Sequence, residues 1–237
     1  MLNKSKYLNP KKREIKFMFN EISKFYDIMN FIMTLGVDKL WRKKIAKKLD
    51  NIKNGKILDI ATGTGDLAIE LKKKCSNKIY GIDVSEKMIE IANKKIRKSG
   101  FENIKLYVGD SQKMPFQNNF FDAVTISFGV RNFENLNKCL SEIKRVLKKN
   151  GKLIILETSV PQSKFLKFFY KIYFNLIISI SFLISKKTYA YKYLYNSASI
   201  FPFGEAFKKI LINNGFKVIS NEKQLFGVAM IYSALKQ

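Results

Sequence analysis

A glycine-rich segment that directly follows an apolar run is the part of this sequence best suited to bind a ligand. It reads Ile57-Leu58-Asp59-Ile60-Ala61-Thr62-Gly63-Thr64-Gly65-Asp66-Leu67. The pattern predicts a strand, a glycine turn and a helix, which together present backbone N–H groups to a ligand with little side-chain obstruction. The spacing Gly63-x-Gly65-x-x-Ala68 also fits the dinucleotide-binding pattern, and Asp83 lies where a carboxylate can bind ribose hydroxyls in either case. The segment alone therefore leaves the ligand's identity open.

Two further carboxylates help to separate the alternatives. Asp59 precedes the glycines, where it can fix the loop or engage the ammonium group of an amino-acid-like ligand, and where it would repel a pyrophosphate. Asp110, in Gly109-Asp110-Ser111 after the third expected strand, can accept a hydrogen bond from the exocyclic amino group of an adenine. Either Asp83 or Asp110 taken singly could cap a helix or a turn instead.

The 237 residues contain no histidine, which excludes several kinds of catalysis. A Ser/His/Asp or Cys/His nucleophile, a His-ligated zinc ion and an imidazole acid or base all require that residue. Two cysteines, Cys75 and Cys139, form neither a metal-binding spacing nor a disulfide framework, so we expect no metal site and a reducing cytoplasm. The N-terminal stretch lacks the apolar core of a secretory signal.

The net charge of +25 suggests a nucleic-acid partner at first sight. Five of the 44 basic residues are arginine, so 39 are lysine, whereas phosphate and base recognition usually relies on the bidentate arginine fork. A solvated lysine surface is therefore favoured over a phosphate-binding one, and no nucleic-acid partner is expected.

The elements that must position these residues alternate between strands and helices. Short apolar runs predict five strands, at 56–60, 78–83, 104–108, 121–127 and 153–157. Amphipathic segments separate them, and Leu136–Leu147 places six apolar side chains on one helical face. This alternation of strands and helices predicts an α/β fold with a parallel sheet covered on both faces. Such a sheet binds its ligand at the carboxyl ends of the strands.

The remaining segments complete a single domain over residues 1–237. Helices are expected at 11–29 and 38–49, within an N-terminal part at 11–50, and the cofactor-binding core is expected at 56–158. A helical insertion at 161–200 precedes a last helix and two C-terminal strands at 203–237, the strands being placed at 216–220 and 226–235.

The segment Phe165–Ile184 is extremely rich in Phe, Tyr, Ile and Leu. Its uncharged part, Ile172–Ile184, is shorter than the roughly 20 residues that a bilayer-spanning helix needs, so we expect no transmembrane helix. A buried helix and an interfacial or lid helix remain open. Five lysines around it, Lys164, Lys167, Lys171, Lys186 and Lys187, favour peripheral contact with an anionic membrane surface.

The ordered motifs from Lys56 to Glu157 resemble those of class I S-adenosylmethionine-dependent methyltransferases. Further segments closely resemble the ubiquinone/menaquinone biosynthesis C-methyltransferase family: Phe25-Tyr26-Asp27-Ile28-Met29-Asn30, Leu35-Gly36, Leu40-Trp41-Arg42, Ile126-Ser127-Phe128-Gly129-Val130-Arg131-Asn132-Phe133, Tyr193-Leu194-Tyr195-Asn196-Ser197 and Phe201-Pro202. The resemblance covers nearly the whole chain. It implies a Rossmann-like sheet of seven strands, the last antiparallel, with S-adenosyl-L-methionine as cofactor and a prenylated quinol such as demethylmenaquinol as methyl acceptor.

The resemblance also implies roles for individual residues. Cofactor contacts carry over to Gly63 and Thr64 in the glycine loop, Asp83 at the ribose, Asp110 and Ser111 at the adenine, and Ser127 after the fourth strand. One departure is visible, because a turn that is commonly Pro-Gly-Gly in the family is Lys149-Asn150-Gly151 here.

On the acceptor side the candidate residues are Tyr26, Asp27, Arg131 and Asn132. Without histidine, a base must be a carboxylate, a tyrosine or a held water. Arg131 is assigned to a developing phenolate or to orienting water, and a purely structural clamp is the alternative. Benzoquinol methylation, nucleic-acid methylation and a non-catalytic membrane-binding role are the competing functions. The sequence leaves open whether the chain forms a homodimer.

Overall fold

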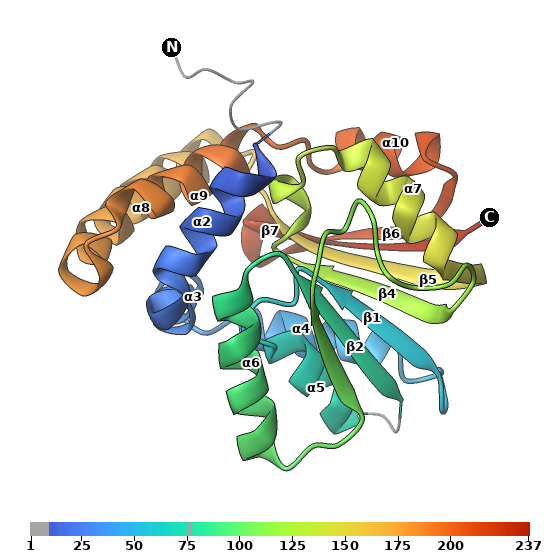
Figure 1. Cartoon of the computed structure of the whole chain (residues 1–237). Coiled ribbons are helices and arrows are strands. Elements are labelled where there is room, and N and C mark those ends of the chain that lie inside the picture. The colour runs from blue at the N-terminus through green and yellow to red at the C-terminus, as the bar shows by residue number, and fades with distance from the viewer. Residues whose placement is uncertain (1–9, 75–76) are drawn as a thin grey trace.

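The computed structural model describes residues 10–74 and 77–237 and contains one seven-stranded sheet (Figure 1). The strand order is β3-β2-β1-β4-β5-β7-β6, with β1 to β5 parallel and β7 antiparallel to both β5 and β6. This confirms the expected fold class and the antiparallel last strand. The strands are β1 (Lys56–Ile60), β2 (Lys78–Asp83), β3 (Ile104–Val108), β4 (Phe121–Ser127), β5 (Leu147–Thr158), β6 (Phe216–Gln224) and β7 (Ala229–Lys236).

Helices cover both faces of the sheet and extend beyond its carboxyl edge. They are α2 (Lys12–Ile22), η1 (Ser23–Phe25), α3 (Tyr26–Thr34), α4 (Asp38–Lys48), α5 (Asp66–Lys74), α6 (Glu86–Ser99), η2 (Val130–Asn132), α7 (Leu136–Val146), α8 (Lys164–Ser185), α9 (Thr188–Ile200), α10 (Glu205–Asn213) and η3 (Leu225–Gly227). In Figure 1, α4, α5 and α6 lie below the sheet and α7 and α10 lie above it, whereas α2, α3, α8 and α9 form a separate helical end.

The alternation of side chains along the strands explains these layers. In β5, Leu153 and Ile155 pack with α7 and α10 on one face, whereas Ile154 and Leu156 pack with α4 and α5 on the other. All four are buried, so the strand reads as a continuous apolar run even though its side chains alternate. The prediction of a sheet covered on both sides is confirmed.

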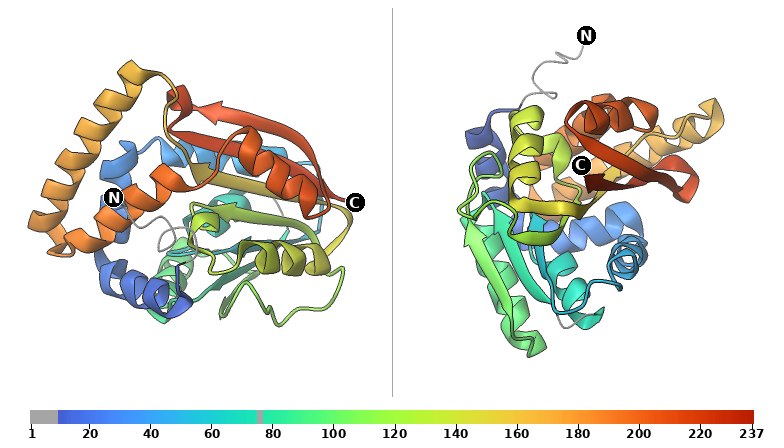
Figure 2. Two further views of the ribbon diagram at one scale, coloured as in Figure 1. Left: turned by 90° about the horizontal axis from the view of Figure 1, so that it is seen from above. Right: turned by 90° about the vertical axis from the view of Figure 1, so that its right-hand side faces the viewer.

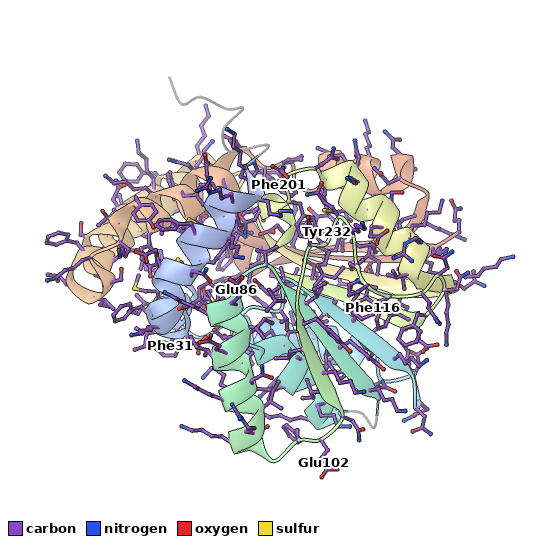
Figure 3. The ribbon with its side chains drawn as sticks, in the orientation of Figure 1. Phe31, Glu86, Glu102, Phe116, Phe201 and Tyr232 are labelled. Carbon is purple, nitrogen blue, oxygen red and sulfur yellow. The ribbon has the colours of Figure 1, made fainter. Side chains whose placement is uncertain are left out.

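Residues 109–120 join β3 to β4 without a helix of their own. Aromatic rings take the place of one: Tyr80 stacks on Tyr107, and Phe116 lies edge-on to Phe121 with ring centroids 4.9 Å apart. Phe116, which belongs to this connection, is labelled in Figure 3. Edge-to-face packing of this kind stabilises the uncovered corner of the core.

Several element boundaries differ from the sequence-based expectation. The fifth strand begins at Leu147 rather than Leu153, because the turn around Asn150, which has φ of +61°, is an irregularity within the strand. The first expected helix is interrupted by the 3₁₀ turn η1. The expected strand 226–235 begins only at Ala229, because Phe226 lies in the tight turn η3.

Helix α8 is 22 residues long, which exceeds the uncharged run counted from the sequence. By length and composition alone it is long and apolar enough to cross a membrane. Only 22% of its most apolar window is buried, so most of that window is not covered by the rest of the protein. Its uncharged part, residues 172–184, is still shorter than a spanning helix needs, so the expectation that this segment does not cross a membrane stays a prediction. The helix packs along α9, where Phe174 contacts Tyr195, and along α3, where the hydroxyl of Tyr173 donates to the carbonyl of Ile32.

Candidate cofactor and acceptor site

A cavity lies at the carboxyl ends of β1, β2, β3 and β4, beneath α2. Most of the cofactor and acceptor residues expected from the sequence line it together: Tyr26, Gly63, Asp83, Asp110, Ser111, Ser127 and Asn132. Thr64 lies beside it, in a small pocket that Asp59 and Arg42 also line. Asp27 lines none of the cavities described in this subsection. The strand ends therefore converge as the parallel sheet predicts.

The glycine loop requires glycine for two different reasons. Gly63 has φ of +56° and directs its N–H to Asp83 Oδ2 at 2.9 Å. At Gly65, with φ of +82°, an added Cβ would lie 3.1 Å from the Cβ of Ala92 on α6. The first glycine sets the turn and the second permits close helix packing.

The loops after β1 and β4 approach each other so closely that a side chain at Gly129 would not fit. A Cβ there would lie 2.5 Å from the Cβ of Ala61. Ala61 and Phe128 both have positive φ, near +53° and +59°. Strained non-glycine residues of this kind concentrate at functional sites, and both of these line the cofactor cavity.

Asp83 is half-buried and already accepts hydrogen bonds from two backbone N–H groups. Oδ1 accepts from Ser85 and Oδ2 from Gly63, each at 2.9 Å. Burial raises the pKa of Asp83, and these hydrogen bonds oppose the shift. A carboxylate has about four acceptor positions, so the side chain can shape the turn and still bind a ribose hydroxyl.

Asp59 fixes the glycine loop and also lines the small pocket beside Thr64. It accepts from the hydroxyls of Thr62 at 2.7 Å and Thr125 at 2.8 Å. Burial raises its pKa to about 6, against the effect of those hydrogen bonds and of Arg42. Of the two roles expected from the sequence, holding the loop is the one its contacts perform.

Asp110 and Ser111 are engaged with residues that the sequence did not indicate. Lys12 on α2 lies 2.8 Å from Asp110 Oδ2. The hydroxyl of Ser111 lies 3.2 Å from the sulfur of Cys139, whose pKa burial raises to about 12. That thiol is therefore protonated near neutrality, and no cluster of metal-ligating side chains occurs among residues 10–74 and 77–237.

The hydroxyl of Ser127 is buried at the end of β4 with no hydrogen-bond partner in the described part of the chain. It lines both the cofactor cavity and the small pocket beside Thr64. An unpaired buried hydroxyl costs about 1–3 kcal/mol, so a ligand that pairs with it is favoured. This hydroxyl, the glycine turn and Asp83 together fit a nucleoside bearing an amino-acid-like group.

A second, apolar cavity of about 370 Å³ adjoins the first. Tyr26 and Phe128 line both cavities and so mark their junction. Its other walls come from α3, α4, α8, α9 and η3, with Tyr170, Tyr173 and Phe174 on α8. A planar apolar ring can therefore lie next to a ligand held in the first cavity.

Arg131 is buried at the wall of the second cavity and is clamped on one side. Its Nη1 lies 2.5 Å from Glu157 Oε1 and donates to the carbonyl of Phe128 at 2.8 Å, while Nε donates to the hydroxyl of Ser197. Among the described residues, Nη2 donates to no protein group. The clamp foreseen from the sequence is thus present, and it leaves one nitrogen available to the cavity.

Of the two remaining residues expected on the acceptor side, Tyr26 lines both cavities, whereas Asn132 lines only the first. Burial raises the pKa of Tyr26, so its hydroxyl stays protonated near neutrality and serves as a donor. Asn132 accepts from the hydroxyl of Tyr193 at 3.1 Å.

Asp27 is committed to other protein groups. It accepts from Thr64 at 2.6 Å and lies 2.6 Å from the Nζ of Lys95 on α6. The same ammonium contacts Asp66 at 2.6 Å. These contacts give Asp27 the means to position Thr64 and the glycine loop.

Four residues of the site are not predicted from the sequence: Lys12, Arg42, Lys95 and Glu157. Arg42 is buried against Asp38 and lies 3.6 Å from Asp66. Arginine is rare in this sequence, with five residues against 39 lysines, and that rarity could have indicated a specific role for Arg42. Nothing in the sequence distinguishes Lys12 or Lys95 from the other lysines.

The chain is similar to known methyltransferases over nearly its whole length. Residues 7–236 match the profile described as the ubiE/COQ5 methyltransferase family. The demethylmenaquinone methyltransferase of Chlorobaculum tepidum is 42% identical over 94% of this chain and 92% of its own length. The ubiquinone/menaquinone biosynthesis C-methyltransferase UbiE of Geobacter sulfurreducens is 37% identical over 97% of this chain and 91% of its own.

Among solved structures, a SAM dependent methyltransferase from Aquifex aeolicus has a TM-score of 0.62 and 20% identity, covering 83% of this chain and 89% of its own. At that identity the likeness supports the fold alone.

Proposed function

This chain belongs to the ubiE/COQ5 methyltransferase family, and from that premise we propose that it methylates a ring carbon of a prenylated quinol, demethylmenaquinol, to give menaquinol. Its cofactor is S-adenosyl-L-methionine. The observation that carries the proposal is the pair of adjoining cavities, one suited to a nucleoside and one apolar, which share Tyr26 and Phe128 as walls. Relatives named for demethylmenaquinone support the naphthoquinol over the benzoquinol.

When bound, the cofactor supplies a methyl group already activated on a sulfonium. The chain must then hold the acceptor ring in line with that methyl group and exclude water. The walls at Tyr26 and Phe128 orient the ring at the junction of the cavities. A quinone ring is electron-poor, so the reduced quinol, with electron density raised by loss of a hydroxyl proton, is the competent substrate.

Arg131 stabilises the phenolate that forms. Its Nη2 faces no protein acceptor among the described residues, whereas Glu157 holds the opposite side of the guanidinium in place. A preorganised donor in a dry site stabilises developing negative charge strongly. The lining of the second cavity includes no Asp or Glu in the part of the chain described, so a water held by polar groups takes both protons. The first is the quinol hydroxyl proton lost before transfer, and the second is the proton that the methylated ring carbon loses afterwards to restore the aromatic ring.

Methyl transfer from labelled S-adenosylmethionine tests this function. The purified chain is offered reduced demethylmenaquinol, its oxidised form, a prenylated benzoquinol and tRNA in parallel. We expect label in the reduced naphthoquinol and little in its oxidised form. Preferential labelling of the benzoquinol would change the substrate, and labelling of tRNA alone would overturn the assignment.

We further propose that the protein is cytoplasmic and binds peripherally to the inner face of the membrane, where prenylated quinols reside. Residues 158–204 contain six lysines and no Asp or Glu, which suits an anionic surface. Changing Lys164, Lys167 and Lys171 to Gln should weaken binding to anionic vesicles severalfold. The matched control changes the exposed lysines Lys94, Lys98 and Lys105 to Gln, and an equal loss in both variants argues against a defined face.

A further inference from the structure

The second cavity opens where its lining side chains are exposed to solvent, and those side chains are apolar. Four residues both line the cavity and are largely exposed: Leu35 at 72%, Phe169 at 51%, Leu225 at 49% and Phe226 at 77%. They come from the end of α3, from α8 and from η3. We call these four residues the rim.

The turn η3 holds two rim residues in an unusual backbone conformation. Leu225 and Phe226 have φ of +38° and +56°, a region that L-residues other than Asn and Asp rarely occupy. Glycine at these two positions would remove the backbone strain, and a polar side chain would avoid exposing apolar surface to water. A strained turn that presents a large aromatic ring to water indicates that the ring has a partner.

The surface around the rim continues the apolar character and adds positive charge. In the left view of Figure 2 the turn between β6 and β7 lies beside the N-terminal end of α8. That part of α8 exposes Phe165 and Phe168, with Lys164 and Lys167 between and beside them. Lys223 lies just before η3 and is also exposed.

We propose that Leu225 and Phe226 form a wedge that inserts into the headgroup and upper acyl region of an anionic bilayer, next to the N-terminal half of α8. The rim then opens the second cavity directly to lipid. A prenylated substrate can place its ring at Tyr26 and Phe128 while its tail stays in the membrane. The substrate part of this inference rests on the proposed function, whereas the wedge itself does not.

Charge distinguishes this occupant from a second copy of the chain. Exposed aromatic rings and lysine ammonium groups together match the composition of interfacial membrane-binding surfaces. The lysine-rich stretch at 158–204 has no acidic residue to meet the lysines of another copy, and the chain carries +25 overall. Like charges therefore oppose self-association through the rim and favour anionic lipid.

Tryptophan placed at the wedge reports its depth. Phe226→Trp is compared with Ile219→Trp, a control at an exposed apolar position on β6 that lines none of the cavities described above. Both variants and the wild type, which contains Trp41 alone, are mixed with vesicles of anionic and zwitterionic lipid carrying brominated acyl chains, without quinol or cofactor. We expect at least twofold stronger quenching for Phe226→Trp than for the control. Equal quenching contradicts the wedge.

Polar substitution tests the energetic contribution of the wedge. Phe226→Ser should lower the partition coefficient onto anionic vesicles about tenfold, because burial of a Phe ring is lost. Ile219→Ser should change it less than twofold. Sedimentation without lipid gives the oligomeric state. If the wild type is a dimer and Phe226→Ser is a monomer, the wedge binds a second copy of the chain and the membrane proposal is overturned.

The two proposals fail separately. Vesicle quenching with no quinol labelling by the wild type would retain the wedge and reject the quinol substrate. Quinol labelling in detergent with no vesicle quenching would retain the function and reject entry from the bilayer.

Discussion

The ammonium group of Lys95 lies 2.6 Å from Asp27 Oδ2 and thereby joins α6 to α3 across the glycine loop. The same nitrogen lies 3.0 Å from the hydroxyl of Thr64. Glu86, labelled in Figure 3 at the start of α6, pairs with Lys16 on α2 in a second link of the same kind. The N-terminal helices are therefore fastened over the cofactor cavity by ion pairs to α6.

Lys95→Met should weaken binding of S-adenosylmethionine about five- to tenfold. The ammonium is only partly exposed and holds two carboxylates and Thr64 in one arrangement, so its loss releases the loop and α3 together. Titration calorimetry measures the affinity. Because partly exposed ion pairs contribute about 1 kcal/mol or less, the melting temperature should change little.

Lys94→Met is the matched control, since Lys94 is exposed on the same helix. It should bind cofactor like the wild type. The double variant Asp27→Asn, Lys95→Met should lose less binding free energy than the sum of the two single losses, because the two residues act as a pair. Full additivity in that cycle would falsify the coupling of Lys95 to Asp27.

Ser127→Ala should separate stability from binding. Removing a buried hydroxyl that has no protein partner in the described chain should leave the protein as stable as before or slightly more stable. The same change should weaken cofactor binding several-fold, because a ligand loses its partner. Ser233→Ala is the control, since that hydroxyl is likewise buried and unpaired but lines none of the three cavities. Equal effects of the two variants on affinity argue against the role of Ser127.

Arg131→Lys should lower kcat by about 100-fold with a smaller change in KM. Lysine keeps the charge next to Glu157, but it cannot hold that carboxylate and present a second nitrogen to the cavity. Turnover is measured on reduced demethylmenaquinol, and thermal melting shows whether the variant is folded. Full turnover by a folded Arg131→Lys variant would leave Arg131 as a structural clamp.

The strand ends were predictable because local pattern determines them. Alternation of apolar runs and amphipathic segments located β1 to β4, and the glycine turn required a helix to follow. Parallel strands then bring Gly63, Asp83 and Ser127 to one edge without further information. The family resemblance is confirmed by the matched profile.

The partners of these residues were not predictable, because they depend on packing between distant segments. Lys12 contacts Asp110, which lies 98 residues further along the sequence, and nothing in the sequence indicates which lysine makes such a contact. The apolar residues that follow Phe226 predict a strand there, and Leu and Phe give no sign of a left-handed turn. The rim of the second cavity therefore emerged only from the structure.

Asp59 should make the stability of the protein depend on pH in an unusual direction. Its pKa is raised to about 6 from an ordinary value near 3.8, so the folded chain holds this proton more tightly than the unfolded chain does. The free energy of unfolding therefore falls as pH rises between about 4 and 6. Between pH 5 and pH 7 this one carboxyl should remove about 1 kcal/mol.

Comparison with Asp59→Asn isolates that effect from other carboxylates. Glu86, Glu142 and Glu222 have lowered pKa values owing to their ion pairs and act in the opposite direction, so the wild-type curve alone is not diagnostic. Urea unfolding at pH 5 and pH 7 should show Asp59→Asn gaining about 1 kcal/mol relative to the wild type as pH rises. A constant difference between the two proteins would mean that Asp59 is ionised throughout, with Thr62 and Thr125 holding it as a carboxylate.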